Sequence, residues 1–378
     1  MKILILSSNL SNEAGGYSES SFLLREKLEV ENNEVYLLGF WKSRYFELNY
    51  KLSDKINIFL PGLINKFPFS YRYLKKIFLV KPQIIDIQGM WSSTSIFNLV
   101  FHFFSKTPYI VTPRGMLEKW ALKQSYIKKK IFYFFVEKYH LKFAACLRAT
   151  SMLEAKTFRQ LGFKNIIIIP NSIKIPKLKY DLKLKKGKRK RLLFLGRLHP
   201  KKGLSELLDS WKHIQKLYKD WELLICGYDE DDYKKEITNK IEKLDLKRVI
   251  VKEFVTGKDK DDLYKSADLF ILPSHSENFG LSIAEALSYR VPVITTTNTP
   301  WKKLHKYKCG WCINLNIRSI VKTLKTAIEL DEKEKKLMGK RGRKWMIKDF
   351  SDQSIGLKMQ SVYNWILKKG PRPKKLIY

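Results

Sequence analysis

Short apolar runs alternate with helical patterns through nearly the whole sequence. The runs are bounded by polar or turn residues, which is typical of buried strands, and the segments between them have helical spacing. In the first half of the chain this pattern predicts strands at Lys2–Ser7, Glu34–Gly39, Ile56–Leu60, Gln83–Gln88, Tyr109–Thr112, Cys146–Thr150 and Asn165–Pro170. It predicts helices between them at Ser18–Leu28, Ile127–Phe143 and Met152–Leu161.

The same alternation restarts near residue 191. It predicts strands at Arg191–Leu195, Trp221–Cys226, Arg248–Phe254, Asp268–Leu272, Pro292–Thr296 and Gly310–Asn314. It predicts helices at Leu204–Tyr218, Lys260–Ser266, Phe279–Tyr289, Ile317–Leu330, Glu332–Lys348 and Asp352–Lys368. Strands that alternate with helices form βαβ units and parallel sheets. We therefore predict an α/β fold with two doubly wound, Rossmann-like domains.

A basic segment separates the two halves of this pattern. Residues 172–191 hold ten lysines and arginines against Asp181 and show no hydrophobic period. Such a composition is typical of a linker. The sequence thus predicts one domain over residues 1–171, a linker over 172–190 and a second domain over 191–351. Ligands of open parallel sheets bind outside the carboxyl ends of the strands, so we expect the chemistry in a cleft between the two domains.

Composition restricts the class of protein but does not identify its ligand. The 378 residues include 73 Lys+Arg and 37 Asp+Glu, a formal net charge of +36, and 44% are hydrophobic. So many apolar residues exclude a disordered basic tail protein. The charge indicates a polyanionic partner, such as nucleic acid, an acidic membrane or a phosphorylated substrate. No apolar run approaches the roughly 20 residues of a membrane span, so we expect a cytoplasmic or peripherally attached protein.

Four cysteines are too few for a disulfide framework in a chain of this length. Cys309 and Cys312 have the C-x-x-C spacing of a redox pair or half a zinc site, but no second such pair completes four ligands. We favour the simpler interpretation, a partly buried strand beside a glycine turn.

Two loops that follow predicted strands have residues suited to phosphate. Gly15 and Gly16 precede the first helix, where paired glycines allow close backbone approach to an anion, although a glycine turn alone more often has a structural role. Arg197 and Lys202 follow the first strand of the second domain, and a guanidinium with an ammonium suits a diphosphate. Two solvated surface cations are the alternative in so basic a chain.

The most specific pattern follows the predicted strand Asp268–Leu272. Glu277 lies in the loop, Gly280 permits a tight turn, and Glu285 comes eight residues after Glu277 in the next helix. The backbone N–H groups of Phe279, Gly280 and Leu281 can point at a phosphate, and the second carboxylate can reach a ribose. The alternative is a helix cap at Glu277 and a surface residue at Glu285.

The spacing Glu277-x7-Glu285, with Phe279-Gly280-Leu281 and Ala286-Leu287 around it, resembles the family-four retaining glycosyltransferases. Gly196-Arg197-Leu198, Lys202-Gly203, Pro170-Asn171 and Gly15-Gly16 occur in the order found in that family. The resemblance covers nearly the entire chain. It implies the GT-B architecture, with the acceptor bound by the first domain and a nucleotide-diphosphate sugar by the second. It also implies that the last helix, about 352–378, joins the first domain.

The same resemblance implies roles for individual residues. Glu277 would bind the donor sugar and Glu285 the ribose, with Asn278 in the same donor-binding run, while Arg197 and Lys202 would stabilise the leaving diphosphate. Phe279, Gly280, Leu281, Gly15 and Gly16 would assist through the backbone. No metal or other cofactor is expected, and the acidic clusters Asp229–Asp232 and Asp259–Asp262 are interpreted as solvated loops.

The first domain departs from the family pattern. Where many relatives have histidines at the ends of the strands, this chain has Asp86 and Gln88 in one and Arg114 after the next. We expect these three side chains to line the acceptor side. None is an obvious general base, which a retaining front-face mechanism does not require, because the leaving phosphate can accept the acceptor proton.

Basic residues mixed with aromatic ones suggest where the remaining charge acts. Residues 123–148 hold seven lysines and arginines against Glu137, and residues 42–81 hold nine against Glu47 and Asp54. Such mixtures suit anionic lipid. For residues 123–148 the alternative is a helix packed on its sheet with a basic outer face.

We therefore expect a metal-independent hexosyltransferase at the inner face of the plasma membrane. It would act on a lipid-linked or other oligosaccharide acceptor in lipopolysaccharide, capsule or exopolysaccharide synthesis, with a UDP- or GDP-linked donor. One alternative is a basic nucleic-acid-binding protein, although no nucleic-acid module is recognisable and we expect no such partner. The other is a GT-B enzyme that epimerises a sugar nucleotide.

Overall fold

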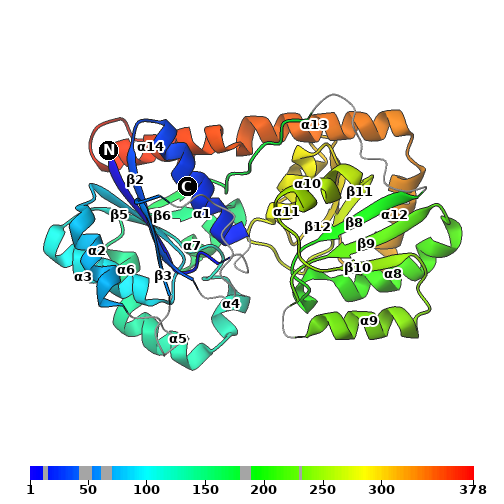
Figure 1. Ribbon diagram of the computed structural model, residues 1–378, viewed down its shortest axis with the longest axis horizontal. Coiled ribbons are helices and arrows are strands. Elements are labelled where there is room, and N and C mark those ends of the chain that lie inside the picture. The colour runs from blue at the N-terminus through cyan, green and yellow to red at the C-terminus, as the bar shows by residue number, and fades with distance from the viewer. Residues whose placement is uncertain (12–15, 42–52, 61–69, 179–188, 230–231) are drawn as a thin grey trace. The chain divides into compact units, whose positions relative to one another are not determined.

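The computed structural model describes residues 1–11, 16–41, 53–60, 70–178, 189–229 and 232–378. They divide into two compact units (Figure 1). Unit 1 comprises Met1–Ser172 with Asp352–Tyr378, and unit 2 comprises Ile173–Ser351. Of the basic segment predicted as a linker, residues 179–188 lie outside the described part, and Ile173 and Ile175 pack in the core of unit 2.

Unit 1 is built on a parallel sheet with the strand order β3-β2-β1-β4-β5-β6-β7. Its strands are β1 (Lys2–Ser7), β2 (Glu34–Phe40), β3 (Ile56–Phe59), β4 (Ile84–Gln88), β5 (Tyr109–Thr112), β6 (Cys146–Ala149) and β7 (Ile166–Ile168). Short runs of branched aliphatic residues form these strands because both faces of a parallel sheet are buried. All seven lie at predicted positions.

Helices cover both faces of this sheet. They are α1 (Gly16–Val30), α2 (Tyr71–Val80), α3 (Ser93–Ser105), α4 (Lys119–Lys123), α5 (Tyr126–Phe132), α6 (Lys138–Lys142), α7 (Met152–Gln160) and α14 (Asp352–Ile366). A π-helical turn, η2 (Tyr133–Glu137), joins α5 to α6. The C-terminal α14 packs beside α1 and buries Ile355, Met359 and Tyr363 against the sheet (Figure 1). The sequence pattern missed α2 and α3.

Unit 2 has a second parallel sheet, with the order β10-β9-β8-β11-β12-β13. Its strands are β8 (Lys190–Leu195), β9 (Trp221–Cys226), β10 (Val249–Lys252), β11 (Leu269–Leu272), β12 (Val293–Thr296) and β13 (Gly310–Ile313). Its helices are α8 (Leu204–Leu217), α9 (Tyr233–Lys243), α10 (Gly257–Ser266), α11 (Leu281–Ser288), α12 (Ile317–Glu329) and α13 (Glu332–Phe350). The predicted pattern omitted α9.

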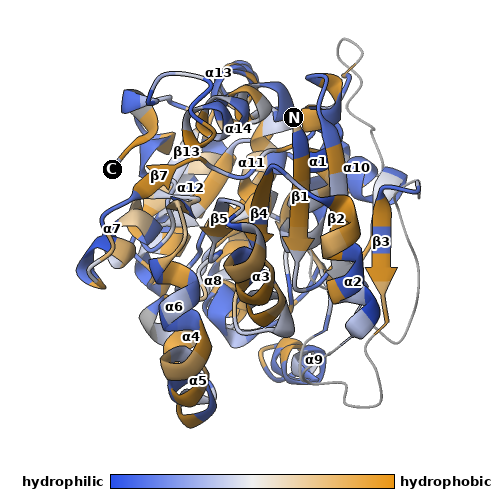
Figure 2. Cartoon of the chain, turned by 90° about the vertical axis from the view of Figure 1, so that its left-hand side faces the viewer, coloured by the Kyte–Doolittle hydropathy of each residue, from blue (hydrophilic) through white to orange (hydrophobic). Residues whose placement is uncertain are grey.

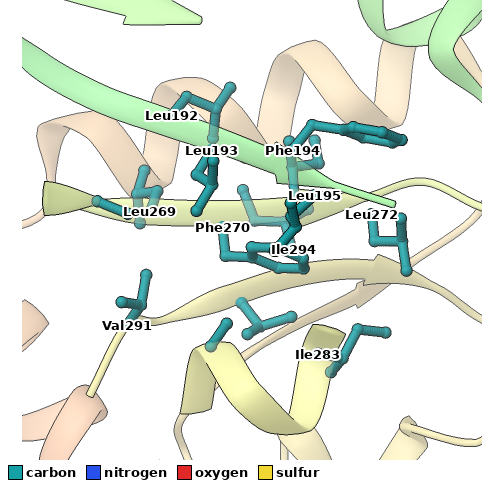
Figure 3. Close-up of a cluster of buried hydrophobic side chains, with 14 of the residues drawn as sticks. Leu192, Leu193, Phe194, Leu195, Leu269, Phe270, Leu272, Ile283, Val291 and Ile294 are labelled. Carbon is teal, nitrogen blue, oxygen red and sulfur yellow. The ribbon is translucent and has the colours of Figure 1, made fainter. Parts of the chain in front are cut away.

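The core of unit 2 fixes the strand ends from which its loops leave. Leu193, Leu195, Phe270 and Ile294 come from the three central strands and gather with Ile283 of α11 (Figure 3). All five side chains are buried. Because close packing leaves little freedom in such a cluster, the loops after β8 and β11 start from rigid positions. The predicted fold class, two Rossmann-like parallel-sheet domains, is confirmed.

Candidate active site

The loops after β8 and β11 hold the strongest candidate site. These two strands are neighbours in the sheet, yet the chain leaves β8 towards β9 on one side and β11 towards β12 on the other. Such a reversal of strand order creates a crevice at the carboxyl ends, where α/β proteins bind ligands. Residues 196–203 and 273–280 form its two sides, and the predicted Arg197, Lys202 and Glu277 all lie there.

Lys202 and Glu277 form an ion pair across this crevice. Lys202 Nζ lies 2.6 Å from Glu277 Oε1, and Ser274 Oγ donates to the same oxygen at 2.7 Å. Only 13% and 9% of the two side chains is exposed. Burial raises the pKa of Glu277, but the Lys202 ammonium and the two hydrogen bonds outweigh it and lower that pKa below its usual 4.5. Glu277 is therefore a buried carboxylate held in its charged form.

Backbone contacts hold the two loops together. Gly203 has φ 69°, and a Cβ at this position would lie 2.0 Å from the carbonyl oxygen of Pro273. His275 N donates to Lys201 O at 2.9 Å, and Thr296 Oγ1 donates to Ser274 O at 2.6 Å. A glycine is therefore required next to Lys202, since any side chain would push the loops apart.

Glu285 lies on α11 and pairs with α10. Lys260 Nζ is 2.5 Å from its Oε1, and Tyr264 Oη donates to its Oε2 at 2.6 Å. Lys260 lies within the Asp259–Asp262 cluster, which belongs to α10, so the helix predicted at Lys260–Ser266 is confirmed and the interpretation of this cluster as a solvated loop is wrong. Sequence reasoning missed Lys260 and Tyr264. The helical spacing of four residues, which puts both on one face of α10, could have revealed them.

The turn between Glu277 and Glu285 positions a helix N-terminus. Gly280, with φ 77°, is the N-cap of α11. Next to it, Trp301 Nε1 donates a hydrogen bond to Phe279 O at 2.5 Å. Ile283 N donates to Gly280 O at 3.0 Å, and because glycine has no side chain to cap the helix, the N–H groups of Leu281 and Ser282 are suited to donate to an anion. Asn278 lies in the same turn, and Arg197 is exposed on the facing loop.

Unit 1 has an equivalent crevice between β1 and β4. Gly16 begins α1 in the loop after β1, whereas Gly15 lies outside the described residues. Tyr17 Oη donates to Gln88 O and bonds Ser8 Oγ at 2.7 Å, which closes the space around Gly89. Aromatic and backbone groups thus occupy the crevice of unit 1.

The three predicted acceptor residues form a buried network in unit 1. Asp86 and Gln88 have no exposed surface. Asp86 accepts from Tyr363 Oη of α14 and from Gln88 Nε2, both at 2.5 Å, and Gln88 Oε1 accepts from Arg114 at 2.8 and 2.6 Å. Burial raises the pKa of Asp86 despite its neighbours, chiefly Arg148, and lowers that of Arg114 to about 10.

The burial of this network can be compared with the expectation that Asp86, Gln88 and Arg114 line the acceptor side. In the structure Asp86 points at the inner side of α14, and Arg114 also bonds Ser20 and Asn171 at 2.6 and 3.0 Å. In this structure Asp86 and Gln88 are therefore buried residues of the polar network, and Arg114 is its partly exposed member.

The remaining chemical candidates are accounted for by ordinary packing. The four cysteines are free thiols, and burial raises the pKa of Cys309 to about 12. Among the described residues, no cluster of three or more His, Cys, Asp or Glu side chains is suited to hold a metal ion. Within the same residues, no helix is long and apolar enough to cross a bilayer.

Comparison with known proteins connects this geometry to a family. The family model for glycosyl transferases group 1 matches residues 179–345, which include Arg197, Lys202, Glu277 and Glu285. An uncharacterized glycosyltransferase of Haemophilus influenzae is 27% identical over 341 residues, 84% of this chain and 88% of that protein. The capsular polysaccharide biosynthesis glycosyltransferase CapM of Staphylococcus aureus is 28% identical over 47% of this chain and 46% of its own.

A solved structure extends the similarity of fold to almost the whole chain. Alr3699/HepE of Anabaena, crystallised in complex with UDP and glucose, superposes with a TM-score of 0.74 over 96% of this chain and 99% of its own, at 18% sequence identity. Identity this low supports the fold alone. Residues 179–345 therefore match the glycosyl transferases group 1 family, the relative from Haemophilus influenzae extends the similarity to most of the chain, and the fold is that of the GT-B glycosyltransferases.

Proposed function

We propose that the protein transfers a hexose from a nucleotide-diphosphate sugar to a saccharide acceptor in bacterial polysaccharide synthesis, with retention at the anomeric carbon. The observation that carries the proposal is the Lys202–Glu277 pair at the reversal point of the unit 2 sheet, in a chain that matches this family. CapM, a capsular polysaccharide biosynthesis glycosyltransferase, supports the pathway class. The UDP and glucose of the HepE complex support a nucleotide-sugar donor.

In this proposal each side chain has a distinct task. The Lys202 ammonium and the Arg197 guanidinium offset the charge that develops on the departing diphosphate, which is where a fixed cation accelerates transfer most. The N–H groups that begin α11 bind the same phosphates. Glu277, kept charged by Lys202, accepts hydrogen bonds from sugar hydroxyls, and Glu285 accepts them from the ribose. With cations supplied by the chain, the reaction needs no metal ion.

Donor binding and turnover test the proposal together. UDP, GDP and ADP are screened for an increase in melting temperature, because a ligand that binds only the folded state stabilises it. The matching nucleotide-sugar is then assayed for hydrolysis and transfer in excess EDTA. We expect one nucleotide to stabilise the protein, and turnover to persist in EDTA but fall at least about 100-fold in Glu277→Ala.

Two other functions give different results in this experiment. A sugar-nucleotide epimerase would convert the donor sugar with no acceptor present. A nucleic-acid-binding protein would bind RNA tightly and with strong salt dependence, and no nucleotide-sugar would bind. The last result would overturn the proposal.

We also propose that the acceptor carries a lipid, so that the enzyme works at the inner face of the plasma membrane. The support is the net charge of +36, which suits both anionic lipid headgroups and a phosphorylated lipid carrier.

A further inference from the structure

Residues 126–143 of unit 1 present a row of large apolar side chains to solvent. Ile127 and Ile131 of α5 are 72% and 56% exposed, and Phe134 and Phe135 of η2 are 59% and 69% exposed. No residue of α5 is buried. Figure 2 shows the hydrophobic stretches of α4 and α5 in orange at the lower tip of the view. We call the outward side chains of residues 126–143 the exposed helical face.

The orientation of this face is fixed from the inner side. Glu137 Oε1 accepts from Trp91 N at 2.7 Å and from Ser95 Oγ at 2.8 Å, and its Oε2 lies 3.0 Å from His140 Nδ1. Glu137 and His140 are completely buried, and Leu141 is 3% exposed. A rotation that buried the phenylalanines would expose this polar anchor. The alternative expected from the sequence is a helix packed on its sheet with a basic outer face. Of the apolar side chains that such packing would bury, Leu141 is buried, whereas Ile127, Ile131, Phe134 and Phe135 are exposed.

Lysines surround the apolar side chains, and no exposed acid balances them. Glu137 is the only acidic residue between positions 119 and 148, and it is buried. Five lysines on these helices are exposed, namely Lys123, Lys128, Lys130, Lys138 and Lys142. Lys138 Nζ lies 5.7 Å from the ring centre of Phe134, so cations and apolar groups share one surface.

The apolar surface continues onto α3. Phe103, 54% exposed, packs edge-on against Phe143 with ring centres 5.8 Å apart, and Phe104 is 78% exposed. Of the other basic and aromatic segment considered from the sequence, residues 42–81, the parts 42–52 and 61–69 lie outside the described residues. Exposed apolar patches of this kind on a folded protein mark an interaction site.

We infer that the exposed helical face, with Phe103 and Phe104, inserts into the headgroup region of an anionic bilayer. The inference rests on the proposed function, whose lipid-bearing acceptor requires such a surface, and it names the part of the chain that binds there. Aromatic and aliphatic side chains would enter the acyl boundary while the lysines contact anionic headgroups, as in interfacial helices. An acidic protein partner would complement the lysines but has no need of the isoleucine and phenylalanine row.

Vesicle sedimentation with the full-length protein tests this inference. Vesicles of phosphatidylcholine alone are compared with an equal mixture of phosphatidylcholine and phosphatidylglycerol. We expect binding to the mixed vesicles that weakens as salt rises. The pair Lys128→Gln with Lys130→Gln should bind about 30-fold more weakly, and Ile131→Ser with Phe135→Ser at least about tenfold more weakly.

Matched variants on unit 2 control for charge and hydrophobicity. Lys235→Gln with Lys243→Gln removes two exposed lysines, and Leu217→Ser with Phe254→Ser removes an aliphatic and an aromatic side chain that are 57% and 39% exposed. Both control pairs should bind like the wild type. Because the substituted side chains of α5 and η2 are exposed, all variants should keep the wild-type melting temperature.

Three results would overturn the inference. They are equal or absent binding to the two kinds of vesicle, equal losses in the test and control pairs, and a wild-type dimer in light scattering that Ile131→Ser with Phe135→Ser converts to monomer. Donor hydrolysis without vesicles separates the two proposals. Vesicle binding lost with hydrolysis intact refutes only the membrane surface, and the reverse refutes only the transferase function.

Discussion

The two sheets of this enzyme reverse their strand order in the same way, yet the charged groups beside the two reversal points differ in accessibility. In unit 2, Lys202 and Glu277 keep 13% and 9% of their side chains exposed and lie on loops. In unit 1, Asp86 and Gln88 belong to strand β4, have no exposed surface and are bonded to each other.

The pKa directions separate the two groups as well. Burial raises the pKa of both Glu277 and Asp86, but the Lys202 cation outweighs it at Glu277, while at Asp86 the partly compensating Arg148 does not. A carboxylate that is held charged chiefly by one lysine, with help from a serine hydroxyl and a second lysine, can exchange the first lysine for a ligand. A carboxylate such as Asp86, enclosed among a tyrosine, a glutamine and arginines, stabilises the fold. Equivalent topology therefore holds an accessible ion pair in unit 2 and an enclosed polar network in unit 1.

The largest expected effect is a loss of activity when the Lys202–Glu277 pair of unit 2 is removed. Lys202→Ala removes the cation that offsets charge on the leaving diphosphate, so kcat should fall about 100- to 1000-fold. Lys201→Ala, one residue earlier, is the matched control and should retain most activity. The measurement is steady-state transfer with a saturating nucleotide-sugar. Equal losses in both variants would contradict a specific role for Lys202.

The next effect concerns the network of unit 1. Asp86→Ala leaves Tyr363 and Gln88 without their acceptor and removes the negative charge near Arg148, so the free energy of unfolding should fall by about 3 kcal/mol. Asp86→Asn, which keeps an acceptor of the same shape, should cost less. Urea unfolding measures both. Nucleotide affinity should stay at the wild-type value in each folded variant, and a selective loss of that affinity would show that Asp86 acts at the site.

A smaller effect tests whether Glu285 binds the ribose of the donor. Replacing it in Glu285→Gln should weaken the binding of the donor nucleotide about tenfold, because a charge-assisted hydrogen bond becomes a neutral one. Calorimetry with the nucleoside diphosphate and with its free base separates ribose from base recognition. The loss should be seen only with the ribose present, and Tyr264→Phe, which leaves the carboxylate in place, should retain more affinity.

The smallest effect is a pH dependence of stability. Since the pKa of Glu277 lies below 4.5 in the folded protein, its pairing with Lys202 stabilises the fold above that value and is lost as pH falls through the lowered pKa. The difference in unfolding free energy between the wild type and Glu277→Gln should therefore shrink as pH falls below 4.5. A difference independent of pH would mean that the ion pair does not stabilise the fold.

Strand positions were predictable because branched aliphatic runs have few alternatives to a buried parallel strand. β1, β5 and β9 coincide with their predicted ranges. The missed helices differ in kind. In α3 apolar residues occupy most positions, which hides the helical period. In α9 the period is present, because Tyr233, Ile237 and Ile241 follow at four-residue spacing among charged residues, and it could have been predicted.

The site was predictable where its residues are near in sequence, and unpredictable where they are not. The segment from Glu277 to Glu285 lies within one loop and helix, whereas the partners Asp86 and Tyr363 are separated by 277 positions. Lys260 lies in a predicted helix, but its pairing with Glu285, which is 25 positions later, does not follow from the sequence. Whether residues 123–148 bury or expose their apolar side chains also depends on Glu137, whose partner Trp91 precedes it by 46 positions.

The discontinuity of unit 1 has a consequence for synthesis of the protein. Ile3 and Ile5 of the first strand share a core with Met359 and Tyr363, so that core is incomplete until the end of the chain has been made. Unit 2, which is continuous in sequence, is fully synthesised earlier. Domains fold as units while the chain emerges from the ribosome. The domain translated first is therefore the last to finish folding, and a message truncated before codon 352 would yield a folded unit 2 attached to an unfinished unit 1.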